Sequence, residues 1–488
     1  MEQPIESLRK VRLEKLKKIR ALKIDPYPIR SQRKYSISET LKLLGKTTTT
    51  AGRVTGFRSH GGSTFMDIVD ESGKIQAYFK KDKLKNAKYS FLTNFDIGDF
   101  IEVSGKVFKT VAGETTIEVA VYSLLAKSLR PLPSSWHGLK DIEIRYRKRY
   151  LDLLLNPEIK NKLAQRTKII QSLRQYLIGE GFLEVETPVL QPLYGGASAR
   201  PFKTHHNALN VDFYLKIADE LYLKRLIIGG YEKVFEIDTD FRNEGIDKSH
   251  NPEFTMLEFY QAYADYEDMM KHCQEAYKYV AKNSLGTTKI KFKNQTIDFS
   301  KPWKRLTMYE AIKKFLGYDV TRLSDKQLKD LLIKHKLKYE GRPALTGEAK
   351  GFKRGIAIAT LFELCEPHLI EPTIIYDFPK ETTALCKPKK ENPDLIERFE
   401  PYIGGMEVGN GYSELNDPIL QKEFFQAQVE AMKSGDEEAH PMDLDFVEAL
   451  EYGMPPTGGL GMGVDRMVMI LTGAPSIKEI IFFPTLKP

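Results

Sequence analysis

The residues best suited to chemistry lie in the stretch 235–260, on either side of a long polar loop. Before the loop, apolar and charged residues alternate up to Arg242, and this period of two predicts a half-buried strand. After the loop, the same period places Phe254, Glu258 and Tyr260 on one face of a second strand. An arginine, an aromatic ring, a carboxylate and a phenol together suit a substrate with a phosphate, a flat base and a cation. Taken alone, the stretch also fits an ordinary hairpin with a charged surface loop.

A second set of polar residues lies between 400 and 417. Glu400 and Glu407 flank a Gly-Gly turn, so their carboxylates could converge. Paired carboxylates, together with substrate phosphates, are the usual way in which proteins hold magnesium. Asn410, Tyr412 and Glu414 share one strand face. Two exposed acids on a strand pair are the plainer alternative for Glu400 and Glu407.

Glycines stand at every second position from Gly459 to Gly463, and Arg466 follows at the start of an apolar run. This spacing leaves one strand face bare, so that a flat ring can lie close to the backbone. The apolar run predicts a buried helix with Arg466 in its first turn. The glycines do not fit G-x-G-x-x-G, which excludes the dinucleotide-binding interpretation.

The composition bounds the elements that must position these residues. A chain of 488 residues and 55.9 kDa predicts two or three domains. Hydrophobic residues at 41% and charged residues at 29% indicate a soluble globular protein. The sequence has no run of about 18 apolar residues, so no membrane-spanning helix is expected. The 3 cysteines are far apart, which favours a reducing compartment and argues against a structural zinc site. A net charge of +8 permits a nucleic-acid partner without requiring one.

Residues 1–30 predict a basic N-terminal helix that is stopped by Pro26 and Pro28. Acidic residues such as Glu6 and Glu14 argue against a transit peptide. A solvated charged helix and a basic helix lying on nucleic acid both remain open.

Short strands with glycine turns between about 50 and 125 predict a small closed barrel, of which the OB-fold is one type, over residues 31–127. A Pro- and Gly-containing linker follows at 128–144, and then a larger domain at 145–488. That domain opens with a helical region running to about Gly181. Residues 183–190 then alternate like a strand, with Pro188 inside it.

The loop of the first stretch and its flanks read Phe241-Arg242-Asn243-Glu244-Gly245 and His250-Asn251-Pro252-Glu253-Phe254-Thr255. This string resembles motif 2 of the class II aminoacyl-tRNA synthetases, in the form found in lysyl-tRNA synthetases. The helix and strand around Pro188 resemble motif 1, and residues 459–466 resemble motif 3. The resemblance covers nearly the whole chain in the right order. It departs from the family at Thr383-Ala384, where Ser-Pro is usual, and at Lys478-Glu479, where Arg-Asp is common.

The resemblance implies an α+β fold: an N-terminal OB-fold β-barrel followed by a class II catalytic domain, an antiparallel sheet flanked by helices. A helical insertion is expected at about 305–370. The implied reaction joins L-lysine to ATP as lysyl-adenylate and then transfers the lysyl group to the 3' end of tRNA(Lys). The implied cofactor is Mg2+, and a homodimer through motif 1 and a cytoplasmic location are expected.

The resemblance also implies the roles of single residues, with Arg242 and Arg466 catalytic. The residues that it assigns to ATP are Arg242, Glu244, His250, Phe254, Glu407 and Arg466. Those that it assigns to lysine are Gly196, Glu220, Arg242, Glu258, Tyr260, Asn410, Tyr412 and Glu414. Magnesium is assigned to Glu400 and Glu407, and the tRNA anticodon to Arg58, Phe65 and Gln76.

Simpler roles remain open for some of these residues. Glu220 also suits a helix N-terminus through the macrodipole. Phe65 could instead lie in the barrel core, with Gln76 a surface residue.

Two rival functions are disfavoured by particular residues. One rival is an enzyme of the same subclass that charges aspartate or asparagine. Aspartate would need a cation in its pocket, whereas Glu258, Tyr260 and Glu414 make this one acidic. A nucleic-acid-binding protein that had lost catalysis would be expected to lack Arg242 or Arg466, and both are present.

Overall fold

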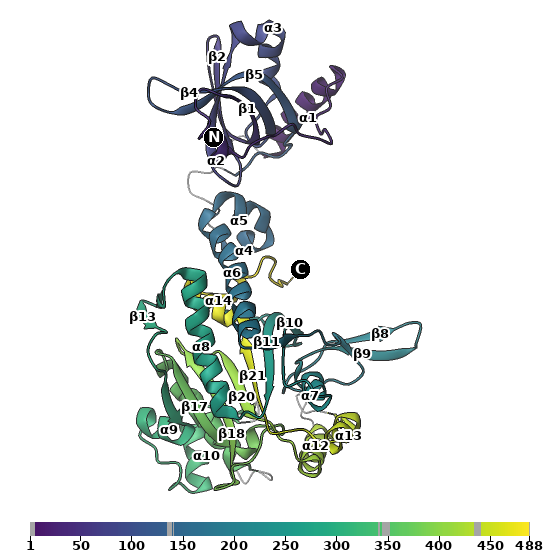
Figure 1. Cartoon of the computed structure of the whole chain (residues 1–488), viewed down its shortest axis with the longest axis vertical. Coiled ribbons are helices and arrows are strands. Elements are labelled where there is room, and N and C mark those ends of the chain that lie inside the picture. Colours follow the sequence, from purple (N-terminus) through teal and green to yellow (C-terminus); the bar gives the residue numbers. More distant parts are fainter. Residues whose placement is uncertain are drawn as a thin grey trace. The chain divides into compact units, whose positions relative to one another are not determined.

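The computed structural model describes residues 5–133, 139, 141–339, 342–343, 352–433 and 441–487. The chain divides into two compact units, Met1–Lys140 and Asp141–Pro488 (Figure 1). Residues 134–138 and 140 of the predicted linker lie outside the described residues. No helix in the described ranges is long and apolar enough to cross a membrane.

The N-terminal unit contains a closed barrel with the strand order β1-β2-β3-β5-β4, which confirms the predicted OB-type fold. Alternate side chains such as Met66, Ile68 and Phe79 point inward and form its core. The residues between them face outward, away from this core. The elements of this unit are α1 Ile5–Ala21, α2 Ile37–Thr40, β1 Thr47–His60, β2 Ser63–Val69, β3 Lys74–Lys80, α3 Lys81–Phe91, β4 Phe100–Lys109 and β5 Thr115–Ala126.

The basic helix α1 packs against the barrel through one face. Leu16 and Ile19 are buried, and the Arg12 guanidinium donates a 2.9 Å hydrogen bond to the carbonyl oxygen of Ile97. Val11 and Leu22, which the helical spacing would place with them, are instead exposed. Arg12 is buried on the face of α1 that packs against the barrel, so this basic residue helps to attach the helix to its own barrel.

The C-terminal unit is built on a 9-stranded sheet with the order β14-β17-β18-β20-β21-β11-β10-β6, and β19 pairs with β18. Neighbours are antiparallel except the β6–β10 and β14–β17 pairs. This mixture of mainly antiparallel sheet and flanking helices confirms the α+β prediction. The strands are β6 Leu183–Glu184, β10 Lys233–Phe241, β11 Glu253–Ala262, β14 Lys304–Thr307, β17 Thr373–Pro379, β18 Leu395–Ile403, β19 Met406–Glu407, β20 Gly409–Ser413 and β21 Thr457–Gly463.

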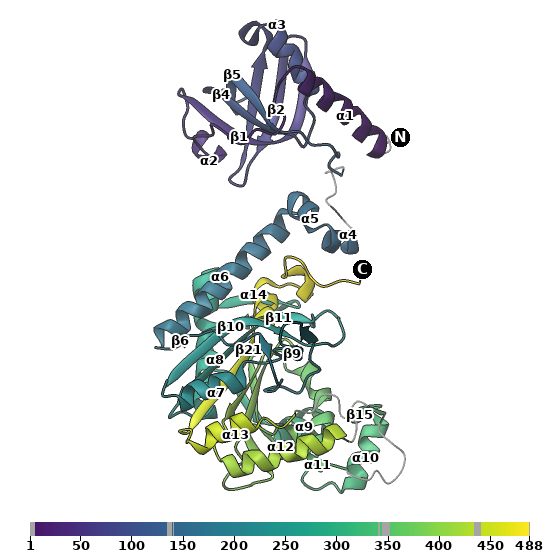
Figure 2. The ribbon, with the colours of Figure 1, turned by 90° about the vertical axis from the view of Figure 1, so that its right-hand side faces the viewer.

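Helices α6, α8 and α14 cover one face of this sheet, and the site lies on the opposite face, parts of which are packed against α7, α9 and α11. Leu257 and Phe259 of β11 are buried in the same cluster as residues of α6, α8 and α14. The long helix α6 runs beside α14 (Figure 2). Since side chains alternate along a strand, Glu258 and Tyr260 point to the opposite face. The helices of this unit are α4 Ile142–Arg147, α5 Arg149–Leu155, α6 Pro157–Gly179, α7 Glu220–Ile228, α8 Tyr266–Leu285, α9 Met308–Leu316, α10 Asp325–Lys334, α11 Arg354–Phe362, α12 Pro418–Lys433, α13 Leu444–Glu451 and α14 Val464–Thr472.

The single strand predicted over residues 183–190 is wrong. Only β6 and the two residues of β7, Leu190–Gln191, are strands, and they belong to different sheets. Pro188 lacks the N–H that a continuous ladder would need. The segment therefore leaves the main sheet and joins a small sheet of β7, β8 Lys203–His206 and β9 Val211–Leu215. The other short strands are β12 Lys289–Phe292, β13 Gln295–Asp298, β15 Lys338–Tyr339 and β16 Arg342–Pro343.

Candidate active site

The glycines of β21 form the floor of the site. In the sheet register, Gly459 lies between Tyr260 on β11 and Tyr412 on β20. A Cβ atom on Gly459 would lie 2.1 Å from Oε1 of Glu414 and 2.4 Å from the Tyr260 ring, so a side chain cannot be accommodated there. At Gly461 the nearest atom would be 3.8 Å away, so the floor is open at that point. The bare strand face expected from the glycine spacing is therefore present.

A buried acidic pocket lies at the Gly459 end of this floor. Glu220, at the start of α7, and Glu414, just after β20, are both buried and both form an ion pair with Lys224. The Tyr260 hydroxyl donates a 3.0 Å hydrogen bond to Oε2 of Glu258.

Gly196 closes this pocket on the side of α7. It has φ +89°, and a Cβ at this position would lie 3.1 Å from Cβ of Glu220. The structure thus brings together most of the residues predicted to bind lysine: Gly196, Glu220, Glu258, Tyr260 and Glu414.

The pKa values of the carboxyl groups in this pocket are raised because the groups lie close together where water is excluded. Burial, followed by the charge of Glu220, raises the pKa of Glu414 to about 8 despite the nearby ammonium of Lys224. Burial and neighbouring carboxylates raise the pKa of Glu258 well above its usual value. Such a pocket favours a ligand that brings positive charge, because a cation stabilises the ionised carboxylates.

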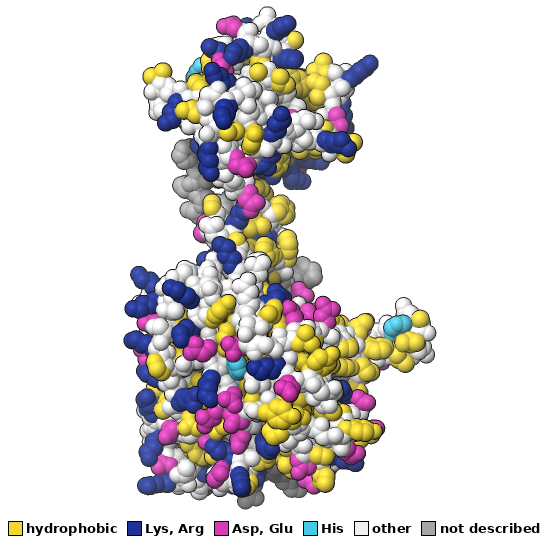
Figure 3. All heavy atoms as spheres, in the orientation of Figure 1, with side chains coloured by type: hydrophobic (Ala, Val, Ile, Leu, Met, Phe, Trp, Pro, Cys, Tyr) yellow, Lys and Arg dark blue, Asp and Glu magenta, His cyan; other side chains and the backbone are white. Residues whose placement is uncertain are grey.

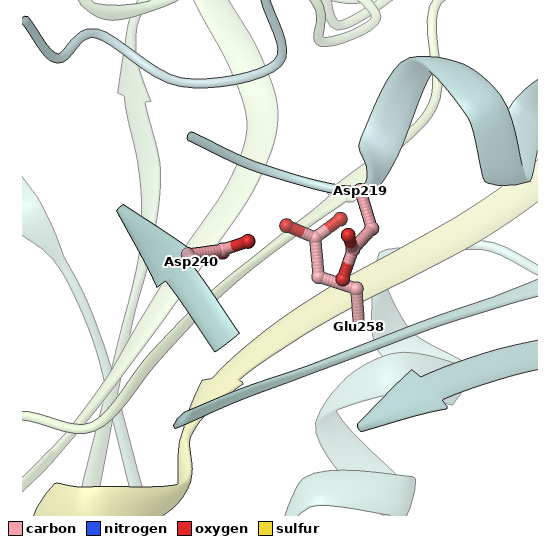
Figure 4. Close-up of side chains that lie close together, drawn as sticks. All are labelled: Asp219, Asp240 and Glu258. Atoms are coloured by element: carbon pink, nitrogen blue, oxygen red, sulfur yellow. The ribbon is translucent and has the colours of Figure 1, made fainter. Parts of the chain in front are cut away.

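Three buried carboxylates, Asp219, Asp240 and Glu258, lie beside this pocket and point toward one another (Figure 4). Their ligand atoms are all within 4.8 Å of one another. The buried ammonium of Lys216, 2.7 Å from Asp219, partly compensates their charge. Burial raises the pKa of Asp219 to about 6, with a further contribution from Glu236.

Sequence reasoning missed Asp219, Asp240 and Lys216. A signal existed for Asp240, because the period of two already places it on the same strand face as Arg242. Nothing comparable indicated Lys216, because two of its partners, Glu236 and Asp238, lie about 20 residues away on β10.

A second group of contacts joins the loop between β10 and β11 to β19 and α14. Arg466 donates to the carbonyl oxygen of Glu407 at 2.7 Å and to its Oε2 at 3.2 Å. The other terminal nitrogen of Arg466 lies 3.0 Å from Nε2 of His250, which in turn pairs with Asp247. Three residues predicted to bind ATP, Arg466, Glu407 and His250, therefore meet at one place.

Arg242 and Phe254 also meet, because the Arg242 guanidinium lies 5.1 Å from the centre of the Phe254 ring. The Nε atom of Arg242 is buried and has no hydrogen-bond partner among the residues that the structure describes. Glu244 is exposed in the loop, and its backbone N–H donates to the carbonyl oxygen of Arg242. The structure does not bring the Glu244 side chain to the other predicted ATP residues.

The carboxylates predicted to hold magnesium lie on the hairpin of β18 and β19. Its turn is made by Gly404 and Gly405, both with positive φ. Glu400 accepts a 2.6 Å hydrogen bond from the Tyr402 hydroxyl and pairs with Arg398.

Glu366, which sequence reasoning missed, adds a third carboxylate to this end of the site. Burial, then the charges of Glu400 and Glu407, raise its pKa to about 7. Three carboxylates therefore repel one another here, and their oxygens are the donors that a hard divalent cation prefers. In the described part of the chain, however, these three carboxylates do not form a group whose oxygens all lie within 4.8 Å of one another, as those of Asp219, Asp240 and Glu258 do.

Asn410 and Tyr412 on β20 lie between the two ends of the site. The Asn410 amide donates to the Tyr412 hydroxyl at 2.7 Å and accepts from Nε of Arg398 at 3.0 Å. These contacts link the acidic pocket to the carboxylates of the β18–β19 hairpin.

The barrel residues Arg58, Phe65 and Gln76 lie on neighbouring strands of the outer face. Phe65 is half-buried outside the barrel core and stacks on Tyr78, with ring centres 4.6 Å apart. Arg58 makes two hydrogen bonds to Asp67, which lies opposite Gln76 in the register.

Gln76 is a buried residue. Its amide donates to Glu114 and accepts from the Thr116 hydroxyl.

Comparison with known proteins identifies the class. Residues 141–487 match the family model described as tRNA synthetases class II (D, K and N). Residues 48–132 match the model of an OB-fold nucleic acid binding domain. The chain belongs to the class II tRNA synthetases and is an aminoacyl-tRNA synthetase, a ligase.

Individual relatives narrow this class. A protein of Thermoanaerobacter pseudethanolicus named lysine–tRNA ligase is 50% identical over 99% of this chain and 97% of its own length. Lysine–tRNA ligases of Moorella thermoacetica and Carboxydothermus hydrogenoformans are 50% and 49% identical, over 98% and 100% of this chain and 97% and 99% of their own. Within the class, the chain belongs to the lysine–tRNA ligase family.

Proposed function

We propose that this enzyme activates L-lysine with ATP to lysyl-adenylate and transfers the lysyl group to the 3' end of tRNA(Lys). The observation that carries the proposal is the buried acidic pocket of Glu220, Glu258 and Glu414 at the edge of a glycine floor. A substrate with two ammonium groups matches the charge of that pocket, and a flat purine matches the floor.

In this proposal, each charged group of lysine has its own partner. The α-ammonium is held by Glu220 and lies against Gly196. The ε-ammonium is held by Glu414, with Tyr260 and Glu258 beside it, and Asn410 and Tyr412 line the pocket. Charge-assisted hydrogen bonds of this kind are stronger than neutral ones and fix the position of the ligand.

The ATP site would use the other end of the floor. The adenine ring would lie on Phe254, and Arg466 would hold the γ-phosphate, with Glu244 and His250 in contact with the nucleotide. Arg242 would hold both the α-phosphate and the lysine carboxylate, so that the two reacting groups meet at one guanidinium.

The chemistry then needs no side-chain nucleophile. A lysine carboxylate oxygen attacks the α-phosphorus, a new P–O bond forms, and the bond to pyrophosphate breaks. In the second step, a terminal ribose hydroxyl of the tRNA attacks the activated carbonyl and AMP leaves. Arg242 and Arg466 contribute by positioning the reactants and by stabilising charge on phosphate oxygens.

Magnesium would be held by Glu400 and Glu407, which fit it by their donor chemistry. When bound, Mg2+ would neutralise phosphate charge during adenylate formation. Glu407 also holds Arg466 at 3.2 Å, so the same carboxylate orders an arginine of the ATP site.

The barrel would bind the anticodon through Arg58, Phe65 and Gln76. The match of residues 48–132 to an OB-fold nucleic acid binding domain supports this role. An unstacked base could lie on the exposed side of Phe65, because aromatic rings accept bases of any sequence. The domain limits that we propose are a basic helix at 1–30, the anticodon-binding barrel at 31–127, a linker at 128–144 and a catalytic domain at 145–488, with its insertion at about 305–370.

A homodimer through motif 1 is also proposed. Apolar side chains at Ile178, Leu183, Leu190 and Val211, on α6 and the strands that follow it, are exposed. On the face shown in Figure 3, hydrophobic side chains make up much of the surface of the projecting β8–β9 hairpin. Clustered exposed apolar residues favour burial by a partner.

A cytoplasmic location is proposed as well. It is supported by the cysteines Cys273, Cys365 and Cys386, which are all free and buried.

Attachment of amino acids to tRNA tests the proposal. Purified enzyme with ATP and magnesium should attach lysine to tRNA(Lys), and should not attach aspartate or asparagine to their own tRNAs. Attachment of aspartate or asparagine in place of lysine would overturn the proposal and support a different enzyme of the same class.

A further inference from the structure

Lys224 is a buried cation inside the acidic pocket, and no sequence pattern distinguished it. It lies on α7, one turn after Glu220, and its side chain is fully buried. Its ammonium is 2.5 Å from Oε1 of Glu220 and also forms an ion pair with Oε2 of Glu414. One ammonium group therefore contacts both carboxylates that are proposed to bind the two ammonium groups of lysine.

The contact uses one oxygen of Glu414 and leaves the other available. Oε1 of Glu414 lies over Gly459, beside the Tyr260 ring. It is buried and has no hydrogen-bond partner in the part of the chain that the structure describes. Since Oε2 faces Lys224, Oε1 is the atom that a substrate ammonium can reach.

We propose that Lys224 is a positioning residue that selects for an amino acid with two ammonium groups. It holds one oxygen of Glu220 and one oxygen of Glu414, so that its charge favours the ionised form of both carboxylates and their other oxygens are left for the substrate. This inference rests on the proposed lysine site.

Charge explains why the pocket needs such a residue. Two buried carboxylates close together do not both ionise without a neighbouring cation, because like charges repel strongly where water is excluded. Burial alone would lower the pKa of Lys224, but Glu220 and Glu414 outweigh it and raise that pKa, so Lys224 stays protonated. Glu258 and Tyr260 add further acidic groups on β11 and no cation.

The charged and titratable groups around Glu414 come from several elements. They are Lys224 and Glu220 on α7, Glu258 and Tyr260 on β11, and Cys386 across an isolated bridge. Farther out, Arg398 on β18 acts on Cys386, and Tyr412 on β20 lies opposite Gly459. Lys224 is the cation in direct contact with Glu414 among the described residues. Removing its charge should therefore raise the pKa of Glu414 further above its value of about 8.

The test compares Lys224→Met with wild-type enzyme by lysine-dependent exchange of labelled pyrophosphate into ATP, from pH 6.5 to about 9. Loss of one partner of a buried charge group should lower kcat/KM for lysine by roughly 100-fold at pH 7, mainly through KM. The deficit should shrink as pH rises, because a higher pH ionises Glu414 again. Lysine's preference over norleucine should also narrow, whereas Lys224→Arg, which keeps the charge, should preserve the wild-type pH dependence.

Lys127→Met is the matched control. Lys127 is also a fully buried lysine that pairs with two carboxylates, Asp96 and Asp99, but it lies in the N-terminal unit. It should lower the unfolding temperature of that unit and leave lysine-dependent exchange unchanged. If Lys224→Met does not fold, Lys224→Gln, which keeps a polar group of similar length, should show the same pH-dependent deficit.

Two results would overturn the inference, and they are distinct from failure of the proposed function. A folded Lys224→Met or Lys224→Gln variant with an unchanged lysine-to-norleucine ratio, or with a deficit equal at every pH, would make Lys224 merely structural. Absence of lysine-dependent exchange in the wild-type enzyme would instead refute the proposed function, and the inference with it.

Discussion

The catalytic sheet and the outer face of the barrel both carry predicted substrate-binding residues, and the two regions differ in how those residues are paired. In the catalytic pocket, Glu414 and Asp240 are buried and have carboxylate oxygens with no hydrogen-bond partner among the described residues. On the barrel face, Arg58 is paired with Asp67, and Gln76 with Glu114. The pocket on the catalytic sheet therefore holds buried carboxylates whose negative charge a cationic ligand would neutralise. On the barrel face, Arg58 and Gln76 would have to break these contacts within the protein before they could contact RNA.

This difference predicts where substitutions act. Changes in the catalytic pocket should reduce amino-acid activation itself, because buried charge is strongly coupled to the ligand. Changes on the barrel face should reduce only the tRNA-dependent step. They should also be smaller, since half-exposed pairs contribute little net energy.

The largest effect is expected for Arg242→Gln. Arg242 would lose contact with both the α-phosphate and the lysine carboxylate, and removing one such transition-state contact costs roughly 1,000-fold in rate. Lysine-dependent pyrophosphate exchange should fall by about that factor. Binding of tRNA(Lys), measured by filter retention, should stay near normal. A variant with normal exchange would show that another group holds the α-phosphate.

The next largest effect is expected for Glu407→Gln. This change removes a proposed magnesium ligand and the ion pair with Arg466, so exchange should fall by roughly 100-fold. Raising the magnesium concentration should recover part of the loss if the metal contact is the cause. An equal loss of tRNA binding would indicate a folding defect and would contradict the metal assignment.

A smaller effect is expected for Phe65→Ala on the barrel. Stacking of a base on an aromatic ring contributes roughly 1–3 kcal/mol, so charging of tRNA should weaken accordingly. Exchange requires no tRNA and should be unchanged. Parallel loss of exchange would instead show that Phe65 supports the fold, since it also stacks on Tyr78.

The smallest effect is a pH dependence of wild-type enzyme. The pKa of Glu414 is raised to about 8, so this carboxyl is mostly protonated at pH 7 and ionises as pH rises. Because an ionised carboxylate is needed for the ε-ammonium, kcat/KM for lysine should rise about fivefold from pH 7 to pH 8. Lysine binding at pH 7 should also release protons, which calorimetry in buffers of different ionisation enthalpy measures. Binding without proton release would contradict this account.

Local sequence patterns were sufficient to predict much of the fold and most of the pocket. The period of two predicted β10 and β11, and alternate glycines predicted the bare face of β21. These signals depend on neighbouring residues, so they are present in the sequence. Glu220, Glu258 and Tyr260 meet at that floor because they lie on predicted elements that border it.

Other features depend on contacts between distant segments and could not be predicted. Lys224 was indistinguishable from any helix lysine, and its role became visible only when Glu414 was placed against it. Glu366 likewise acquires its raised pKa from Glu400 and Glu407, which are far along the chain. The strand predicted over 183–190 is wrong because the alternation of side chains does not show that Pro188 interrupts the ladder of backbone hydrogen bonds.

The most direct test of the central claim is a panel of amino acids in the pyrophosphate exchange assay with wild-type enzyme. Lysine should support exchange, and ornithine, which is one methylene shorter, should be roughly 10–200-fold poorer. Norleucine, which lacks the ε-ammonium, should support only very weak exchange, and aspartate, whose side chain is negative, should give no detectable exchange. Exchange with norleucine close to that with lysine would contradict recognition by Glu414, and exchange with aspartate would contradict the acidic pocket itself.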